Sequence, residues 1–272
     1  MSANSLASAL GEASQARLPE HVSFSQIDLA TKCLESWRQR YLVGAQGTGS
    51  AALATGSSVH AGIASLYDTL KDKPKASRAL LLTNALTASS EENEKRSAYL
   101  DTETRDRVEF ETAGLLETYI AQRPTHIKPL QTEKEIRVAL PDTDIYLKGF
   151  IDLEAETSLV EIKTSARKIT LPTGAWKVQA WLYQAAVPKP VEWHVLVKQK
   201  TPLLITSAAL AVPYSETMTR RALSLASSTL ERIQELYAER GPDEEWPLSG
   251  VLHPWACSMC DAKHSCIYGA HS

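Results

Sequence analysis

The stretch from Gly149 to Lys163 constrains this chain most, because it reads as two short apolar strands joined by a polar turn. In the second strand Glu161 and Lys163 are two residues apart, so their side chains leave the same face. Ile162 lies between them and points into a core. A hairpin at this place would bring the carboxylate of Asp152, near the end of the first strand, beside Glu161.

Two carboxylates with a lysine beside them form a specific chemical group. Carboxylate oxygens suit Mg²⁺ or Mn²⁺, and a lysine next to the metal orients or deprotonates a water, or stabilises charge that develops on a phosphate. The alternative is a surface hairpin with an ordinary Glu161–Lys163 pair, which the short motif by itself does not exclude. The rest of the chain has to decide between the two.

Composition favours a globular protein that binds nucleic acid through local surface. Of the 272 residues 43% are hydrophobic and 22% charged, and the net charge of −3 argues against indiscriminate coating of nucleic acid. Any DNA-binding surface must therefore be local, and its candidates follow the motif: Lys163, Arg167, Lys168 and Lys177. No apolar run reaches the length of a membrane span and no signal peptide is evident, so we expect a cytoplasmic protein without a membrane partner.

Periodicity predicts an α/β order of helices, three strands, a helix and a strand. We expect a disordered tail over 1–20 and a single domain over 21–272. Within that domain, the predicted helices cover 25–41, with Cys33 inside, 55–70, 75–123 with a break near 89–93, 174–187 and 215–240. The predicted strands cover 133–140, the two hairpin segments, 191–197 and 203–212. Residues 55–124 form a helical insertion and 241–272 a C-terminal cysteine module.

Two polar features lie on predicted helices away from the hairpin. Gln179 and Tyr183 are four residues apart, so they lie one above the other on one helix face. His60 stands beside the apolar stripe of an earlier helix. Taken separately, each is an ordinary helical residue that is commonplace in a protein core or on its surface.

The four cysteines have the spacing of metal ligands. Cys257, Cys260 and Cys266 place three thiols within ten residues, and Cys33 is far away near the N-terminus. A reducing compartment makes two disulfides an unsuitable explanation. Four thiolates hold either a [4Fe–4S] cluster or a tetrahedral Zn²⁺, and the third alternative is simple buried thiols.

The order of these residues along the chain resembles the RecB-like branch of the PD-(D/E)xK nuclease superfamily, in particular the AddB nuclease domain and the CRISPR-associated RecB-like exonucleases. The residues that carry the resemblance are Cys33, His60, Asp152, Glu161, Lys163, Gln179, Tyr183, Cys257, Cys260 and Cys266. The resemblance spans about Ser23 to Cys266, and it departs from the usual pattern at Leu34, where the family often has a proline.

The resemblance implies a restriction-endonuclease-like core, with a central mixed sheet flanked by helices and a helical N-terminal half. It implies that His60, Asp152, Glu161 and the carbonyl of Ile162 bind one or two Mg²⁺ or Mn²⁺. Catalysis would involve Asp152, Glu161 and Lys163, with Gln179 and Tyr183 positioning the strand. The four cysteines would bind a [4Fe–4S] cluster that joins the N- and C-terminal parts.

We therefore expect a metal-dependent DNA exonuclease that acts on DNA ends or single strands in recombination, repair or end processing, of a phage type or a CRISPR-spacer type. The alternatives are a non-catalytic DNA-binding module of a recombination complex and a zinc-stapled nuclease with endonuclease activity. The chain lacks a P-loop, so unwinding would need a helicase or recombination partner. The sequence leaves the oligomeric state open.

Overall fold

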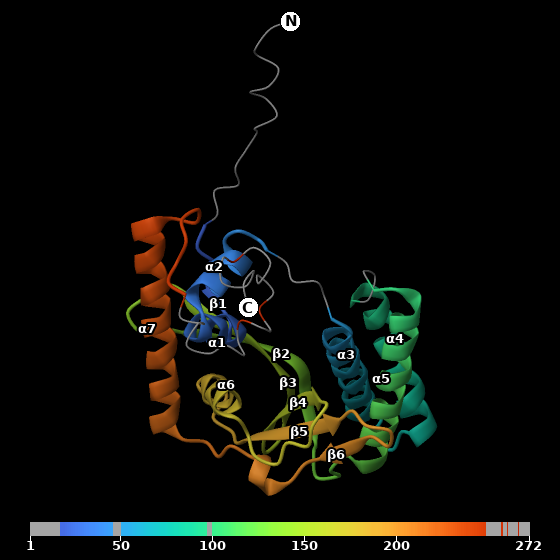
Figure 1. The fold of residues 1–272 in the computed structure, drawn as a ribbon. Coiled ribbons are helices and arrows are strands. Elements are labelled where there is room, and N and C mark those ends of the chain that lie inside the picture. Colours follow the sequence, from blue (N-terminus) through green and yellow to red (C-terminus); the bar gives the residue numbers. More distant parts are fainter. Residues whose placement is uncertain are drawn as a thin grey trace, which may run out of the picture. The chain divides into compact units, whose positions relative to one another are not determined.

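The computed structural model describes residues 17–45, 50–96 and 100–248 together with Cys257, Cys260 and Cys266 (Figure 1). Most of the tail predicted over 1–20 lies outside the described residues. Contacts within the chain define two compact units. The larger unit is Thr48–Leu225, and the smaller one combines Met1–Gly47 with Ala226–Ser272.

A mixed sheet forms the centre of the larger unit. Its strands are β2 (Pro129–Ala139), β3 (Tyr146–Ala155), β4 (Leu159–Ser165), β5 (Val191–Val197) and β6 (Leu203–Ile205). They pair in this order, with β4 and β5 parallel and the other pairs antiparallel. Asp142 has a φ of 58° in the β2–β3 turn, a conformation that aspartate tolerates. The predicted α/β fold with a mixed sheet flanked by helices is confirmed.

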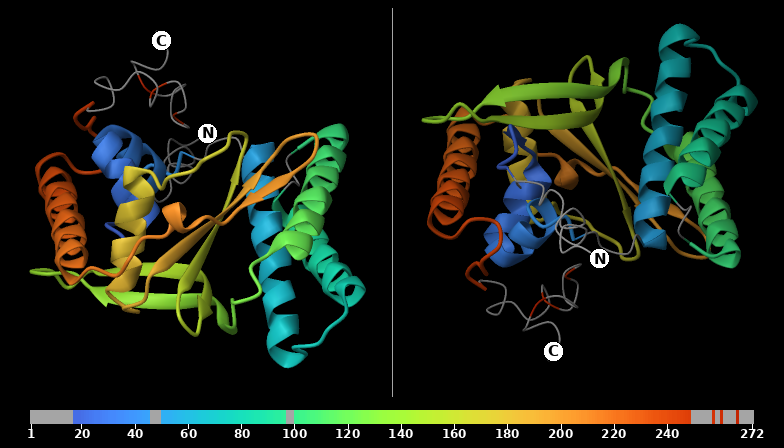
Figure 2. Two further views of the ribbon diagram at one scale, coloured as in Figure 1. Left: turned by 90° about the horizontal axis from the view of Figure 1, so that it is seen from below. Right: turned by 90° about the horizontal axis from the view of Figure 1, so that it is seen from above.

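Helices cover this sheet on two sides. Figures 1 and 2 show α3 (Ala51–Asp72), α4 (Arg78–Arg96) and α5 (Thr102–Gln122) side by side, with the strands between them and α6 (Gly174–Gln184). Apolar residues of α3, α4 and α5 form a continuous core with the inner face of β3, β4 and β5. No helix among the described residues is long and apolar enough to cross a membrane.

Two segments of the larger unit differ from the prediction. The break expected near 89–93 is wrong, because α4 continues to Arg96 and turns the polar side chains of Ser89 and Asn93 inward, where they are buried. Packing therefore overrides the polar composition of that segment. The strand predicted to end at Val212 stops at Ile205 and is followed by a single 3₁₀ turn over Ala208–Leu210.

The smaller unit contains β1 (His21–Val22), α1 (Phe24–Lys32), α2 (Leu34–Tyr41) and the second part of α7 (Glu216–Arg240). The single helix predicted over 25–41 is wrong. Cys33 interrupts it with extended backbone, at φ −161° and ψ 114°. A cysteine in a break between two helices presents its thiol differently from one inside a helix, which bears on the predicted cysteine cluster.

A buried ion pair ties the two ends of the chain together within the smaller unit. Arg38 donates two hydrogen bonds to Glu35, at 2.8 and 2.6 Å. The Trp246 N–H also donates to Glu35, at 2.8 Å, and its ring stacks on Trp37 with 5.8 Å between centroids. Burial works to raise the Glu35 pKa, but the bonds from Arg38, Gln39 and Trp246 lower it overall, so the carboxylate is held ionised.

Candidate metal-dependent active site

The candidate site lies where the β3–β4 hairpin opens. The antiparallel register pairs Glu154 with Leu159 and Leu153 with Val160, so Asp152 and Glu161 are the next positions along the two strands. Beyond this point side chains replace the backbone ladder. The Ile162 N–H donates to Asp152 Oδ2 at 2.7 Å, and the Asp152 N–H donates to Glu161 Oε1 at 3.4 Å. The two carboxylates predicted to meet are therefore adjacent.

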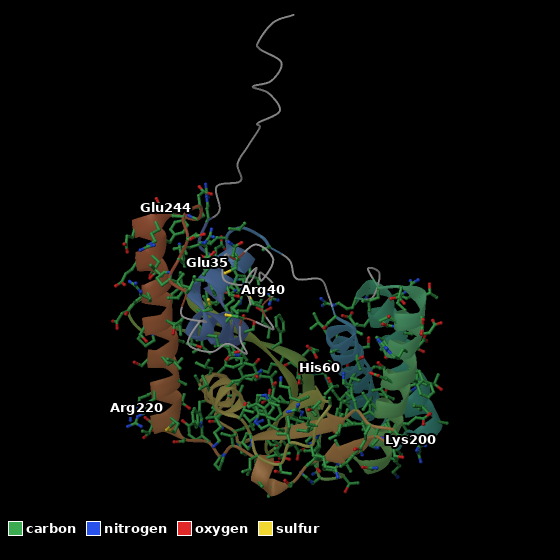
Figure 3. The ribbon with its side chains drawn as sticks, viewed as in Figure 1. Glu35, Arg40, His60, Lys200, Arg220 and Glu244 are labelled. Carbon is green, nitrogen blue, oxygen red and sulfur yellow. The ribbon has the colours of Figure 1, made fainter. Side chains whose placement is uncertain are left out.

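His60 reaches this pair from α3. Its Nδ1 lies 3.0 Å from Asp152 Oδ1, and Figure 3 labels the residue on the side of α3 nearest the strands. The helix places it there because Val59 and Ile63, its neighbours on the apolar stripe, are buried in the core that α3 shares with the sheet. The imidazole and the carboxylate come from residues 92 positions apart in the sequence.

Glu133 joins His60 and Asp152, and sequence reasoning did not single it out. Each of the three offers one ligand atom, and these atoms lie within 4.8 Å of one another. Glu133 is located on β2 between Thr132 and Lys134, which pair with Leu153 and Ile151, so it faces Asp152 across the two strands. The one available signal was this cross-strand position, which needs the register to be known.

The backbone of Glu133 is in an unusual conformation. Its φ is 45°, the left-handed region that non-glycine residues rarely adopt. A conformation of this kind costs on the order of 1–2 kcal/mol and is most often found where function requires it. Here it accompanies an irregularity in the β2 register between Pro129 and Gln131.

Gln179 and Tyr183 on α6 support Glu161. The amide of Gln179 donates to Glu161 Oε2 at 3.1 Å and to the Tyr183 hydroxyl at 3.0 Å. The Tyr183 ring approaches β3 closely at Gly149, where a Cβ atom would lie only 2.9 Å from the ring. The predicted positions four residues apart on one helix face therefore form one hydrogen-bonded chain that ends on the buried carboxylate.

Lys163 lies beside Glu161, with 3.9 Å between Nζ and Oε2. Its ammonium also lies 5.2 Å from the centre of the Trp193 ring, an attractive cation–π position. Glu161 is 1% exposed, whereas Lys163 is half-buried and lines an open pocket. The ammonium is thus held between an aromatic face and the pocket.

The charges of the site are unevenly distributed. Burial and the neighbouring Asp152 raise the pKa of Glu161 well above its ordinary value. Burial also acts on Asp152, but His60 and Lys163 outweigh it and lower the Asp152 pKa. Burial and Asp152 likewise raise the pKa of Glu133. A divalent cation bound here would favour the ionised form of all three carboxyl groups.

A pocket of about 570 Å³ opens over the site. His60, Glu133 and Lys163 line it, together with small residues of α3 and with Glu92 and Arg96 of α4. Of the predicted basic surface, Lys163 is in this lining, whereas Arg167, Lys168 and Lys177 are exposed outside it.

The four cysteines are free thiols, and all four belong to the smaller unit. Burial raises the pKa of the Cys257 thiol, and the charges of Cys33, Cys260 and Cys266 raise it further. The Cys260 Sγ lies 3.2 Å from the Ser36 hydroxyl at the start of α2. Thiolates are ligands that both zinc and iron–sulfur clusters accept, and Cys33 is contributed from the break between α1 and α2.

Paired carboxylates, an imidazole and a lysine at the opening of two strands of a mixed sheet are the groups that a divalent-metal-dependent phosphodiester hydrolase uses. Comparison with known families agrees. Residues 21–267 match the model of the PD-(D/E)XK nuclease superfamily. The chain belongs to this superfamily, whose members use divalent metals and act on DNA.

A solved structure shares the fold. The "Putative exonuclease" of Eubacterium rectale aligns at a TM-score of 0.61 and 15% identity, over 98% of this chain and 94% of that chain. The protein SSO0001 aligns over 96% of this chain and 91% of that chain at 11% identity, but its TM-score of 0.38 supports no argument. No curated protein matches this chain.

Proposed function

We propose that this chain is a Mg²⁺- or Mn²⁺-dependent deoxyribonuclease of the RecB-like branch that degrades DNA from ends or along single strands. The observation that carries the proposal is the group of His60, Glu133 and Asp152, whose ligand atoms lie within 4.8 Å of one another beside Lys163 in one open pocket. Carboxylate and imidazole ligands that leave room for water suit Mg²⁺ and Mn²⁺.

In this proposal His60, Glu133, Asp152 and Glu161 hold the metal, with the Ile162 carbonyl added by family resemblance. A divalent cation bound there supplies the charge that activates water and stabilises the phosphate as negative charge develops on it. Asp152 is fixed for this task by the Ile162 N–H at 2.7 Å and by His60 at 3.0 Å. The raised pKa of Glu161 means that a cation bound there would compete with a proton for this carboxyl group.

Lys163 would orient the attacking water and neutralise the phosphate. Its ammonium is kept near the site by Glu161 at 3.9 Å and by the Trp193 ring. Gln179 would keep Glu161 in one orientation, and Tyr183 would keep Gln179 in place through their bond of 3.0 Å. Each of these side chains is thus held in place by a named neighbour.

We favour exonuclease action because α4, in the helical insertion, contributes to the wall of the pocket over the metal group. A helix in that position restricts how a DNA strand enters. The name of the Eubacterium rectale structure agrees with this choice. Action in recombination, repair or end processing, and a single nuclease domain over residues 21–272, remain predictions from the family resemblance.

We also propose that Cys33, Cys257, Cys260 and Cys266 bind a [4Fe–4S] cluster. Four cysteines are the usual ligands of such clusters, and Zn²⁺ is the competing occupant because it also takes four thiolates. The cluster would be structural, since thiolates at every ligand position leave no site for substrate.

Degradation of end-labelled single-stranded and double-stranded DNA in the presence of Mn²⁺ tests the nuclease proposal. The wild type should shorten the labelled strand, and Lys163→Ala should reduce the rate at least about a hundredfold, the range that a positioned acid–base group contributes. Lys200→Ala is the matched control, because Lys200 is an exposed lysine at the β5–β6 turn, away from His60 in Figure 3.

The outcomes separate the candidate functions. A wild type that binds DNA without cutting it would favour the non-catalytic binding module. Equal rates for Lys163→Ala and Lys200→Ala would remove Lys163 from the mechanism. Internal cuts in a circular single strand would identify an endonuclease.

A further inference from the structure

The pocket over the metal group has a second wall that the proposed chemistry does not use. Its volume of about 570 Å³ exceeds what a metal ion and its waters need and falls in the range of about 300–1,000 Å³ typical of ligand sites. Glu92 and Arg96, one turn apart at the C-terminal end of α4, line this wall. Among the described residues that line the pocket, Lys163 and Arg96 are the two with permanent positive charge.

Arg96 is held at the pocket by an ion pair. Its Nε lies 2.7 Å from Glu92 Oε1. The side chain of Arg96 is 59% exposed and that of Glu92 is 20% exposed. This contact uses one of the five donors of the guanidinium, and the planar group matches the geometry of a phosphate. An exposed ion pair of this kind contributes little to stability, so replacing Glu92 by a phosphate as the partner of Arg96 costs little free energy.

The C-terminal end of α4 lines the same pocket as the metal group. Glu92 and Glu133 both line the pocket, so the two carboxylates face a common region. A divalent cation bound by His60, Glu133 and Asp152 would add its two positive charges to those of Lys163 and Arg96 in the pocket lining. The pocket is then complementary to more than one phosphate group of a DNA strand.

We propose that Arg96 is a positioning residue that binds a phosphate of the DNA strand next to the one that is cut, and that it leaves Glu92 when the strand enters. This inference rests on the proposed nuclease function. Lys163 and the metal act on the reacting phosphate from β4, and Arg96 holds a neighbouring phosphate from α4. The strand is thereby held at two points.

The neighbouring Lys95 provides a matched control. It carries the same charge and also lies near Glu92, with 4.0 Å between Nζ and Oε2. However, its side chain is 70% exposed and it is outside the pocket lining. Arg96→Ala and Lys95→Ala therefore remove equal charge from adjacent positions, and only the first removes it from the pocket.

The test measures degradation of a dye-labelled oligothymidylate with saturating Mn²⁺ over a range of salt concentrations. Arg96→Ala should raise KM about tenfold with little change in kcat, because a lost charged hydrogen bond of this size weakens binding uniformly. It should also reduce the slope of log(kcat/KM) against log salt by about 0.7, the value for one phosphate contact to a single strand. Arg96→Lys should recover part of the affinity. Glu92→Gln should lower KM, since it releases Arg96.

Each outcome decides the question. Equal KM values and salt slopes for Arg96→Ala and Lys95→Ala would overturn the proposal, as would a Glu92→Gln variant that raises KM as much as Arg96→Ala does. Since Arg96 is exposed, Arg96→Ala should melt within about 2 °C of the wild type. A wild type without nuclease activity removes both proposals, whereas an active wild type with an inactive Lys163→Ala keeps the proposed function and tests Arg96 alone.

Discussion

Glu161 is a carboxyl group in a place where a carboxylate is costly. It is 1% exposed, it lies next to Asp152, and its pKa is raised well above the ordinary value by burial and by that neighbour. Because the pKa is raised, a proton competes with a divalent cation for this carboxyl group, so metal affinity should increase as the pH rises.

We predict that Glu161→Gln preserves the fold but abolishes stabilisation by Mn²⁺. Glutamine resembles the protonated carboxyl in size, so the metal-free melting temperature should change little. In the wild type, Mn²⁺ at a hundred times its dissociation constant should raise the free energy of unfolding by about 2.7 kcal/mol. Thermal melting with and without Mn²⁺ measures this difference.

Glu135→Gln is the control for this experiment. Glu135 is an exposed glutamate of β2 that pairs with Arg137 and Lys148, outside the metal group. Its substitution should leave the Mn²⁺ effect at the wild-type value. If Glu161→Gln also kept the full effect, Glu161 would not be a metal ligand.

The buried His194 should make the free energy of unfolding depend on pH. It is fully buried on β5, and its Nδ1 lies 2.8 Å from the Tyr119 hydroxyl. Burial, with a smaller contribution from His126, lowers the pKa of His194 to about 3. At pH values above 6.5 neither the folded nor the unfolded chain protonates it. As the pH falls from 6.5 towards 3, the His194 imidazole becomes protonated in the unfolded chain but stays neutral in the folded chain.

The free energy of unfolding should therefore fall over that interval, by on the order of 4 kcal/mol at its lower end. Urea denaturation between pH 7 and pH 4 measures the slope. His194→Asn should flatten it whatever its effect at pH 7, and the matched substitution His126→Asn at an exposed position should not. A slope unchanged in His194→Asn would place the titrating group elsewhere.

At the scale of elements, α3 is the helix on which both the core and the site depend. It carries His60, and it also contains two glycines, Gly56 and Gly62, that lie a little under two turns apart. A Cβ atom at Gly62 would lie 2.7 Å from Leu116 of α5 and 3.0 Å from the Ala85 carbonyl of α4. A Cβ atom at Gly56 would meet only Thr164 Oγ1, at an ordinary 3.6 Å.

We predict opposite effects for the two glycines. Gly62→Ala should destabilise the protein by about 1–3 kcal/mol, because the backbone of α4 cannot move away as a side chain does. Gly56→Ala should stabilise it by up to about 1 kcal/mol, since alanine favours the helix. Urea denaturation of both variants tests this, and equal midpoints would show that the three helices tolerate separation.

The elements also show what could be predicted from the sequence. The positions of Asp152, Glu161 and Lys163 follow from the two-residue period of a strand, which a short segment displays completely. Glu133 could not be found in this way, because its approach depends on the register of β2 against β3 and on a positive φ that no periodicity encodes. Arg96 was missed for a related reason, since the predicted helix break would have placed it in a separate segment.

At the scale of the whole molecule, the smaller unit is made from both ends of the chain. Glu35, Trp37 and Cys33 come from the N-terminal end, whereas Trp246 and the other cysteines come from the C-terminal end. Ligation by all four cysteines would close a loop that contains most of the chain. By the estimate used for disulfides, such a closure removes on the order of 4–5 kcal/mol of chain entropy from the unfolded state.

We predict that Cys33→Ser lowers the melting temperature and solubility more than Asp152→Ala does. The first opens the loop and removes a ligand, whereas the second relieves charge repulsion at the metal site. Protein purified without oxygen should be brown, with about four iron and four sulfide per chain. Colourless protein with one zinc would refute the cluster and leave the nuclease proposal intact.

The left-handed backbone of Glu133 has a consequence for protein engineering. A laboratory selection that rewards heat resistance alone would favour glycine at this position, because glycine adopts a φ of 45° without strain. The same change would remove a carboxylate from the metal group. Variants obtained from such a selection would therefore be more stable but inactive. Libraries intended to improve both stability and activity should keep glutamate at position 133.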